Sequence, residues 1–121
     1  MEKQKIMIVD DQPAICTSVT GMLKFDYTVF PFTSGKDALD FLKTNTIDLI
    51  LLDYEMPGMT GYEVLINIRM HQNTKATPVV FLTGATNERM RQEMMGRGAT
   101  DYLTKPVDPD ALKNCIKKYL P

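Results

Sequence analysis

Short apolar runs that end at a polar residue recur four times along this chain of 121 residues. The runs are IMIV (6–9), IDLILL (47–52), VVFL (79–82) and YL (102–103). The polar residues at or just beyond their ends are Asp10 and Asp11, Asp53, Thr83, and Lys105. Runs this short, flanked by polar residues, are typical of strands. Because the carboxyl ends of parallel strands share one edge of a sheet, we expect these side chains to meet there.

Helical patterns alternate with the strands. Pro13, for example, opens a stretch in which Ile15, Val19 and Leu23 recur at helical spacing. Five strand signals alternating with five helix signals predict an α/β fold, a flavodoxin-like (βα)5 doubly wound parallel five-stranded sheet with strand order 2-1-3-4-5. Strand 27–32 contains Pro31, which cannot donate to a ladder, and so is expected at an edge. The run 47–52 is apolar almost throughout and is expected in the middle.

Capping signals mark the ends of several helices. Ser34 with Asp37, and Thr60 with Glu63, have the spacing of a capping box. Gly98 follows a helix expected at about 87–97 and suits a left-handed C-terminal cap. The helix boundaries therefore have local signals in the sequence.

Composition limits the classes of function. The 14 basic and 15 acidic residues nearly balance, which argues against a nucleic-acid interface. The N-terminus, MEKQKIMIVDD, predicts neither a signal peptide nor a membrane span, so we expect a cytoplasmic protein. The length fits one domain over residues 1–121. Cys16 and Cys115 have no metal-binding spacing and are expected to be reduced, part-buried thiols.

Four segments together resemble the response regulator receiver domain of two-component signalling, in particular its single-domain chemotaxis regulators. They are IMIVDDQP, LILLDYEMPGMTGYEVL, VVFLTG and GATDYLTKP, and they occur in the family's order across essentially the whole chain. The resemblance implies a signalling domain over residues 1–121 that accepts a phosphoryl group. It implies no enzymatic activity beyond the domain's own phosphorylation and dephosphorylation.

By this resemblance Asp53 is the phosphoacceptor, and Mg²⁺ is the cofactor. Asp11 and Asp53 would be direct carboxylate ligands, Asp10 would act through water, and Glu55 would supply its main-chain carbonyl. Carboxylates about 4 Å apart repel by roughly 4 kcal/mol per pair at an effective dielectric constant of ~20. A hard dication that prefers oxygen ligands removes that repulsion.

The resemblance also assigns Lys105, Thr83 and Tyr102. The ammonium of Lys105 would neutralise phosphoryl oxygens, aimed by a cis bond to Pro106. Thr83 would donate its hydroxyl to another phosphoryl oxygen and act as a switch together with Tyr102. The output surface would then comprise the fourth helix, the fifth strand and the fifth helix.

Methionines in the fourth helix raise the question of what that surface exposes. Met90, Met94 and Met95 could form an adaptable partner surface or fill the core, and for Met95 we expect the core.

The implied partners are proteins. A sensor histidine kinase or phosphotransfer protein would donate the phosphoryl group, and a downstream protein target or effector domain would respond. No direct nucleic-acid or membrane binding is expected, and the chain would be a monomer or a phosphorylation-dependent dimer. His71 lacks neighbours that would make it a ligand or phosphodonor, so the donor histidine would belong to a partner.

Two positions beside the site depart from the more usual pattern. Glu55 is a long acid that could reach Lys105 or the path of attacking water, and Ala85 lies two residues after Thr83. In the family such side chains tune the lifetime of the phosphoryl group.

Other classes of function remain as alternatives. A haloacid dehalogenase-type phosphatase also uses an aspartyl nucleophile with magnesium, but its D-x-D pattern follows the first strand, where this chain has DDQP. A flavodoxin would need a hydroxyl-rich phosphate loop where this chain has acids. A receiver-like scaffold that is not phosphorylated would not need the full set of acids, threonine and lysine.

Overall fold

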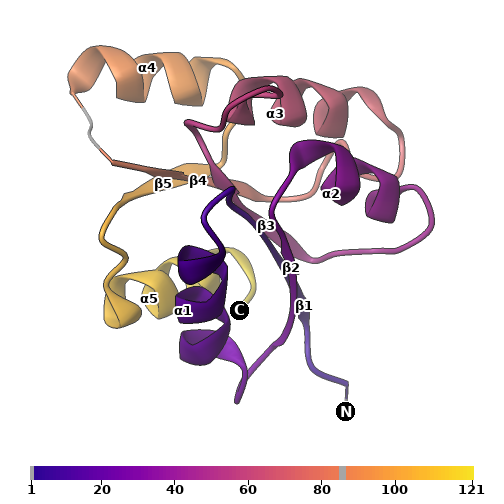
Figure 1. Ribbon diagram of the computed structural model, residues 1–121, viewed down its shortest axis with the longest axis vertical. Helices are drawn as coiled ribbons and strands as arrows, with labels where there is room; N and C mark the ends of the chain where they lie inside the picture. The colour runs from indigo at the N-terminus through magenta and orange to yellow at the C-terminus, as the bar shows by residue number, and fades with distance from the viewer. Residues whose placement is uncertain (1, 85–86) are drawn as a thin grey trace.

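The computed structural model describes residues 2–84 and 87–121, in which five strands and five helices alternate (Figure 1). Their bounds are β1 Lys5–Val9, α1 Pro13–Leu23, β2 Thr28–Phe32, α2 Gly35–Leu42, β3 Leu49–Asp53, α3 Gly61–Met70, β4 Val79–Thr83, α4 Glu88–Gly96, β5 Asp101–Thr104 and α5 Pro109–Tyr119. The strands pair in parallel in the order β2-β1-β3-β4-β5. The predicted fold class and strand order are confirmed.

Helices cover both faces of the sheet. One apolar core joins alternate residues of the central strands to α2, α3 and α4, and a second joins the intervening residues to α1 and α5. Figure 1 shows this division, with α1 and α5 together on one side of the strands and α2 and α3 on the other. Within the described ranges, no helix has the length and apolar character needed to cross a membrane.

The position of each strand follows from its composition. All five residues of β3 are buried, as expected for the central strand with helices on both faces. β2 lies at the edge, and its Pro31 is exposed beside Ile8 of β1. An edge strand has one side without a pairing partner, where a missing N–H donor costs nothing.

Side-chain caps fix the starts of α2 and α3. The hydroxyl of Ser34 accepts a hydrogen bond from the amide of Asp37, at 3.1 Å. At Thr60 the full capping box forms, because the Glu63 side chain also accepts from the amide of Thr60. Gly98, just after α4, has φ of +106° and supplies the expected left-handed conformation.

The prediction that Met95 of α4 lies in the core is wrong. Met94 is fully buried against α3 and the sheet, whereas Met95 is 39% exposed. Consecutive helical residues point about 100° apart, so only one of the two can face the core. Met95 is therefore a surface residue, and Met90 is half-buried.

Both cysteines are free, and both are more deeply buried than expected. Cys16 is 5% and Cys115 is 8% exposed. The thiol of Cys16 lies 3.5 Å from the carbonyl oxygen of Asp10, and burial is the main cause that raises its pKa. Burial likewise raises the pKa of Cys115, to about 11. Neither thiol is ionised to a useful extent near neutral pH.

Candidate functional site

Strand register brings the predicted site residues to one edge of the sheet. Val9 of β1 is paired with Leu52 of β3, so the next residues, Asp10 and Asp53, are neighbours. Asp53 is in turn paired with Leu82 of β4, immediately before Thr83. Thr83 is paired with Thr104 of β5, immediately before Lys105. The register therefore confirms that these four strand ends, of β1, β3, β4 and β5, lie side by side as the sequence predicted.

Three carboxylates converge there. One oxygen from each of Asp10, Asp11 and Asp53 lies within 4.8 Å of the others. Asp10 is fully buried and Asp53 is 3% exposed, whereas Asp11 is more open to solvent. Clustered carboxylate oxygens with access to solvent suit a hard divalent cation that retains part of its water shell.

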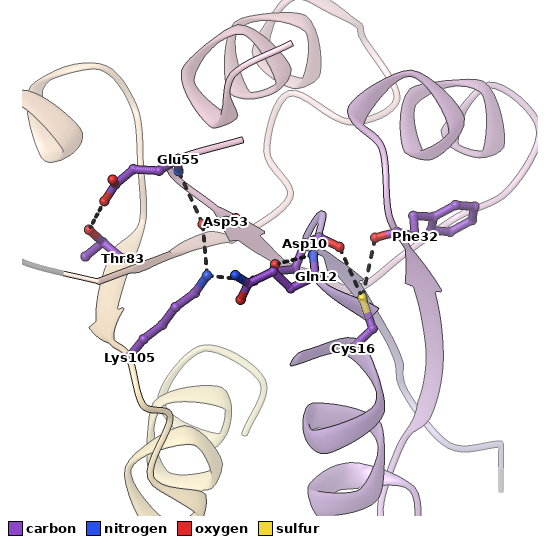
Figure 2. Close-up of polar contacts among 8 residues, drawn as sticks. All are labelled: Asp10, Gln12, Cys16, Phe32, Asp53, Glu55, Thr83 and Lys105. Carbon is purple, nitrogen blue, oxygen red and sulfur yellow. Dashed lines mark hydrogen bonds and ion pairs between the residues drawn. The ribbon is translucent and has the colours of Figure 1, made fainter. Parts of the chain in front are cut away.

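The ammonium of Lys105 lies between two of these acids. Its Nζ is 2.8 Å from Oδ2 of Asp10 and 3.1 Å from Oδ1 of Asp53 (Figure 2). The Lys105–Pro106 peptide bond is cis, as the resemblance implied. Burial lowers the pKa of Lys105, but its hydrogen bonds to Asp10 and Asp53 outweigh that effect and raise it overall.

The net charge of the site is negative and could be balanced by a dication. Three ionised carboxylates and one ammonium carry a net charge of about −2, so Lys105 neutralises only one of the acids. A dication would complete the balance, and the donor set therefore fits Mg²⁺.

Asp53 is held from two directions. Its Oδ1 accepts from the amide of Glu55 at 3.2 Å and from Lys105. Burial is the largest influence on this carboxyl and raises its pKa to about 6, with the charge of Asp10 adding to the effect and Lys105 opposing it. Since both hydrogen bonds go to Oδ1, the other oxygen, Oδ2, is the better placed to act as a nucleophile.

Asp10 is also fixed by the backbone that follows it. Its Oδ1 accepts from the amide of Gln12 at 2.9 Å, which links it to the start of α1. The amide of Gln12 and the ammonium of Lys105 thus both contact this fully buried carboxylate. A buried charge is costly unless it has such partners.

Thr83 and Glu55 contact each other beside the acids. Thr83 is fully buried, and its hydroxyl donates to Oε1 of Glu55 at 3.4 Å. The length of the Glu55 side chain would allow it to reach Lys105 or the path of attacking water. In the structure its carboxylate contacts Thr83, while Lys105 pairs with Asp10 and Asp53. Ala85, the other flanking position, lies outside the described residues.

Tyr102 is half-buried in β5 and packs against the core shared with α2, α3 and α4. The sequence did not predict the hydrogen bonds that Asp101 makes with Tyr102 and with Tyr119. Oδ1 of Asp101 accepts from the amide of Tyr102 at 2.8 Å, and Oδ2 accepts from the hydroxyl of Tyr119 at 2.7 Å. No local spacing relates β5 to the end of α5, so only the tertiary structure reveals this pair.

His71 lies away from the acids, at the end of α3. It is exposed, and its Nδ1 hydrogen-bonds to the carbonyl oxygen of Asn67 at 2.7 Å. The structure thus places it where the sequence had suggested, outside the site.

Comparison with known proteins shows the family. The family model for the response regulator receiver domain matches residues 6–117. The chain therefore belongs to the response regulator receiver domains, the signalling domains that act as phosphoacceptors in two-component systems.

Curated relatives are longer than this chain. A probable cyclic di-GMP phosphodiesterase of Vibrio cholerae is 41% identical over 115 residues, which is 95% of this chain but 26% of that protein. The cell cycle response regulator CtrA of Brucella ovis is 35% identical over 109 residues, 89% of this chain and 46% of that protein. The chain thus spans about a quarter to a half of the length of these relatives.

Solved structures of similar size match over nearly the whole chain. The chemotaxis protein CheY4 of Vibrio cholerae superposes with a TM-score of 0.92 at 33% identity, covering 97% of this chain and 98% of that one. The receiver domain of the sensor histidine kinase PA1611 from Pseudomonas aeruginosa superposes with a TM-score of 0.89 at 28% identity, covering 98% of both. The latter structure has a magnesium ion coordinated in its active-site cleft.

Proposed function

We propose that Asp53 is the phosphoacceptor of this domain. The supporting observation is the arrangement at the sheet edge, where three carboxylates and one ammonium meet and Asp53 is held at Oδ1 by Glu55 and Lys105. In the proposed reaction an oxygen of Asp53 forms a bond to phosphorus. The bond from phosphorus to the imidazole nitrogen of a donor phosphohistidine breaks, and its electron pair stays on the imidazole.

Asp11, Asp53 and the main-chain carbonyl of Glu55 would hold Mg²⁺ directly, with Asp10 acting through water. When bound, the ion supplies positive charge that offsets repulsion between the carboxylates and the phosphoryl oxygens. The solved receiver domain of PA1611, which contains magnesium, supports this assignment.

The chain's own groups complete the phosphoryl site. Lys105 is within reach of Asp53 and carries the fixed positive charge that an in-line phosphoryl transfer requires. Thr83 extends from the neighbouring strand and would donate its hydroxyl to a phosphoryl oxygen. Tyr102, on the strand beyond, would respond by packing more deeply.

We further propose that residues 1–121 act as one receiver domain between two protein partners. A histidine kinase or phosphotransfer protein would load Asp53, and the surface formed by α4, β5 and α5 would bind the downstream target or a second copy of the domain. Within this proposal the domain catalyses only its own phosphorylation and dephosphorylation.

Intact-mass spectrometry after incubation with acetyl phosphate and Mg²⁺ tests the assignment. The expected result is a mass increase of one phosphoryl group that EDTA prevents and Asp53→Asn abolishes. Asp26→Asn, which removes an exposed carboxylate from the loop before β2, is the matched control and should retain the adduct.

Two other results would contradict the proposal. Continuous hydrolysis of varied phosphomonoesters would indicate a phosphatase. Absence of any adduct on the folded protein would indicate a scaffold.

A further inference from the structure

The carboxylate of Glu55 lies beside Thr83, where its negative charge would repel a phosphoryl group on Asp53. Its Oε1 lies 3.4 Å from the hydroxyl of Thr83, on the side of the site where a phosphoryl group would need that hydroxyl (Figure 2). A phosphoryl group on Asp53 would be anionic, so an acid at this position adds repulsion. A role limited to phosphoryl binding therefore does not explain the side chain.

Glu55 connects the acceptor to the switch residue. Its amide donates to Asp53, and its side chain accepts from Thr83. The first contact belongs to the main chain and any residue except proline could make it, whereas the second requires an acceptor side chain of sufficient length. Thr83 is fully buried, while Glu55 lies at the exposed rim of the site.

The hydroxyl of Thr83 has a single hydrogen to donate. It can donate to Glu55 or to a phosphoryl oxygen, but not to both at full strength. The two acceptors compete, so the contact with Glu55 stabilises the arrangement in which the phosphoryl group is absent.

We propose that Glu55 is a positioning residue that holds the Thr83 hydroxyl in the resting arrangement and thereby sets the equilibrium between the resting and activated states. The inference rests on the proposed function, because it takes Thr83 as a ligand of the phosphoryl group. It concerns the population of the two states, which differs from the lifetime of the phosphoryl bond.

Binding of beryllofluoride with Mg²⁺ measures that equilibrium without a covalent step. Because this hydrogen bond is long, at 3.4 Å, and its acceptor is exposed, its loss in Glu55→Ala should tighten binding of this phosphoryl mimic by about three- to tenfold. Glu55→Gln keeps an amide oxygen as acceptor and should show a smaller gain. Glu2→Ala removes the same charge at the exposed N-terminus, far from the site, and should leave the affinity unchanged.

A double-mutant cycle separates the hydrogen bond from the effect of charge. In a Thr83→Val background there is no hydroxyl to hold, so Glu55→Ala should change beryllofluoride affinity much less than it does in the unmodified protein. Thr83→Ala provides a second background if the valine variant folds poorly, and Thr83→Ser should restore the coupling. In the resting protein, the methyl resonance of Thr83 should also shift on Glu55→Ala.

The outcomes distinguish the two levels of the proposal. Equal tightening with and without the Thr83 hydroxyl would overturn the positioning role and leave a charge effect in its place, while the phosphoacceptor assignment would stand. Failure of the unmodified, folded protein to bind beryllofluoride or to form the aspartyl adduct would overturn both.

Discussion

The surroundings of the Asp53 carboxyl, the proposed acceptor, disfavour its charged form. Asp53 is almost fully buried and its pKa is raised to about 6, mainly by burial, although Lys105 opposes the shift. A cation bound beside such a carboxyl favours its ionised form and lowers its pKa. The ionisation of Asp53 thus depends on pH and, under the proposed function, on bound Mg²⁺.

Mg²⁺ binding should weaken as the pH falls through 6, because protons compete with the ion for Asp53. With a pKa of about 6, the ionised fraction of Asp53 falls roughly tenfold between pH 7 and pH 5. The association constant for Mg²⁺, measured by calorimetry, should fall by up to about that factor. In Asp53→Asn, the weak Mg²⁺ binding that remains should no longer fall between pH 7 and pH 5. If the variant kept the pH profile of the unmodified protein, the role of Asp53 as the competing group would be contradicted.

Without Mg²⁺, Asp53→Asn should stabilise the fold at neutral pH. The carboxyl titrates near 3.8 when unfolded and near 6 when folded, so the folded state binds more protons between these values. Stability contributed by this group is therefore present below about pH 4 and is lost as the pH rises through 6.

Urea denaturation measures this effect. The asparagine variant should gain on the order of 1 kcal/mol at pH 7.5 and little at pH 4. Asp26→Asn, which changes an exposed carboxylate, should show no such difference between the two pH values. A loss of stability at pH 7.5 in Asp53→Asn would contradict the prediction.

At the scale of elements, the start of α3 is fitted closely to the end of β3. A Cβ atom on Gly61 would overlap the carbonyl oxygen of Asp53 and the Cα of Tyr54, so α3 approaches β3 this closely only because residue 61 has no side chain. The backbone at Asp53 is consequently in close contact with the start of α3.

Gly61→Ala should lower the free energy of unfolding by roughly 1–3 kcal/mol, because the overlapping atoms are main-chain atoms that cannot rotate away. Gly21→Ala is the matched control, since a Cβ there meets nothing within 4 Å and lies in the exposed interior of α1. This second change should stabilise the protein by up to about 1 kcal/mol. Equal effects of the two substitutions in urea denaturation would show that the close approach has no energetic consequence.

α4 should be the helix least protected from hydrogen exchange. Met94 is the one buried residue within Glu88–Gly96, whereas α3 buries Gly61, Val64, Leu65 and Ile68. Little buried apolar area means a small free energy of local opening. Amides in α4 should exchange at least about tenfold faster than those in α3 by mass spectrometry or NMR, and similar protection in both helices would contradict this.

Sequence patterns predicted the elements well because their signals are local. Prolines, capping residues and apolar periodicity indicated five strands and five helices, and the strand bounds expected from the sequence differ from those of the structure by at most two residues. The error at Met95 arose because α4 has a weak apolar pattern in which either of two adjacent methionines could face the core. The direction of the Glu55 side chain was not predictable, because it depends on where Thr83 of a different strand lies.

At the scale of the whole molecule, the location of the site could be predicted because the strand order determines which residues lie together. A parallel sheet in the order 2-1-3-4-5 places Asp10, Asp53, Thr83 and Lys105 at one edge whatever the details of the loops. The contacts of Asp101 with Tyr102 and Tyr119 could not be anticipated in the same way, because they depend on how α5 packs along β5.

Mg²⁺ should raise the thermal stability of the whole domain, because the proposed binding site exists only in the folded state. At a hundred times its Kd the ion should add about 2.7 kcal/mol. For a chain of 121 residues this corresponds to a rise in Tm of roughly 5–15 °C, measured by differential scanning fluorimetry. Potassium chloride of equal ionic strength should give a much smaller rise, and an equal rise would indicate general screening instead of a specific site.

The two buried thiols have a practical consequence for experiments on this domain. Cys16 and Cys115 are shielded from solvent and have raised pKa values, so thiol reagents should react with them slowly while the protein is folded. A cysteine introduced on the exposed face of α4, in place of Met95 for instance, would then be labelled selectively in an otherwise natural sequence. A fluorophore or spin probe at that position could follow activation in real time.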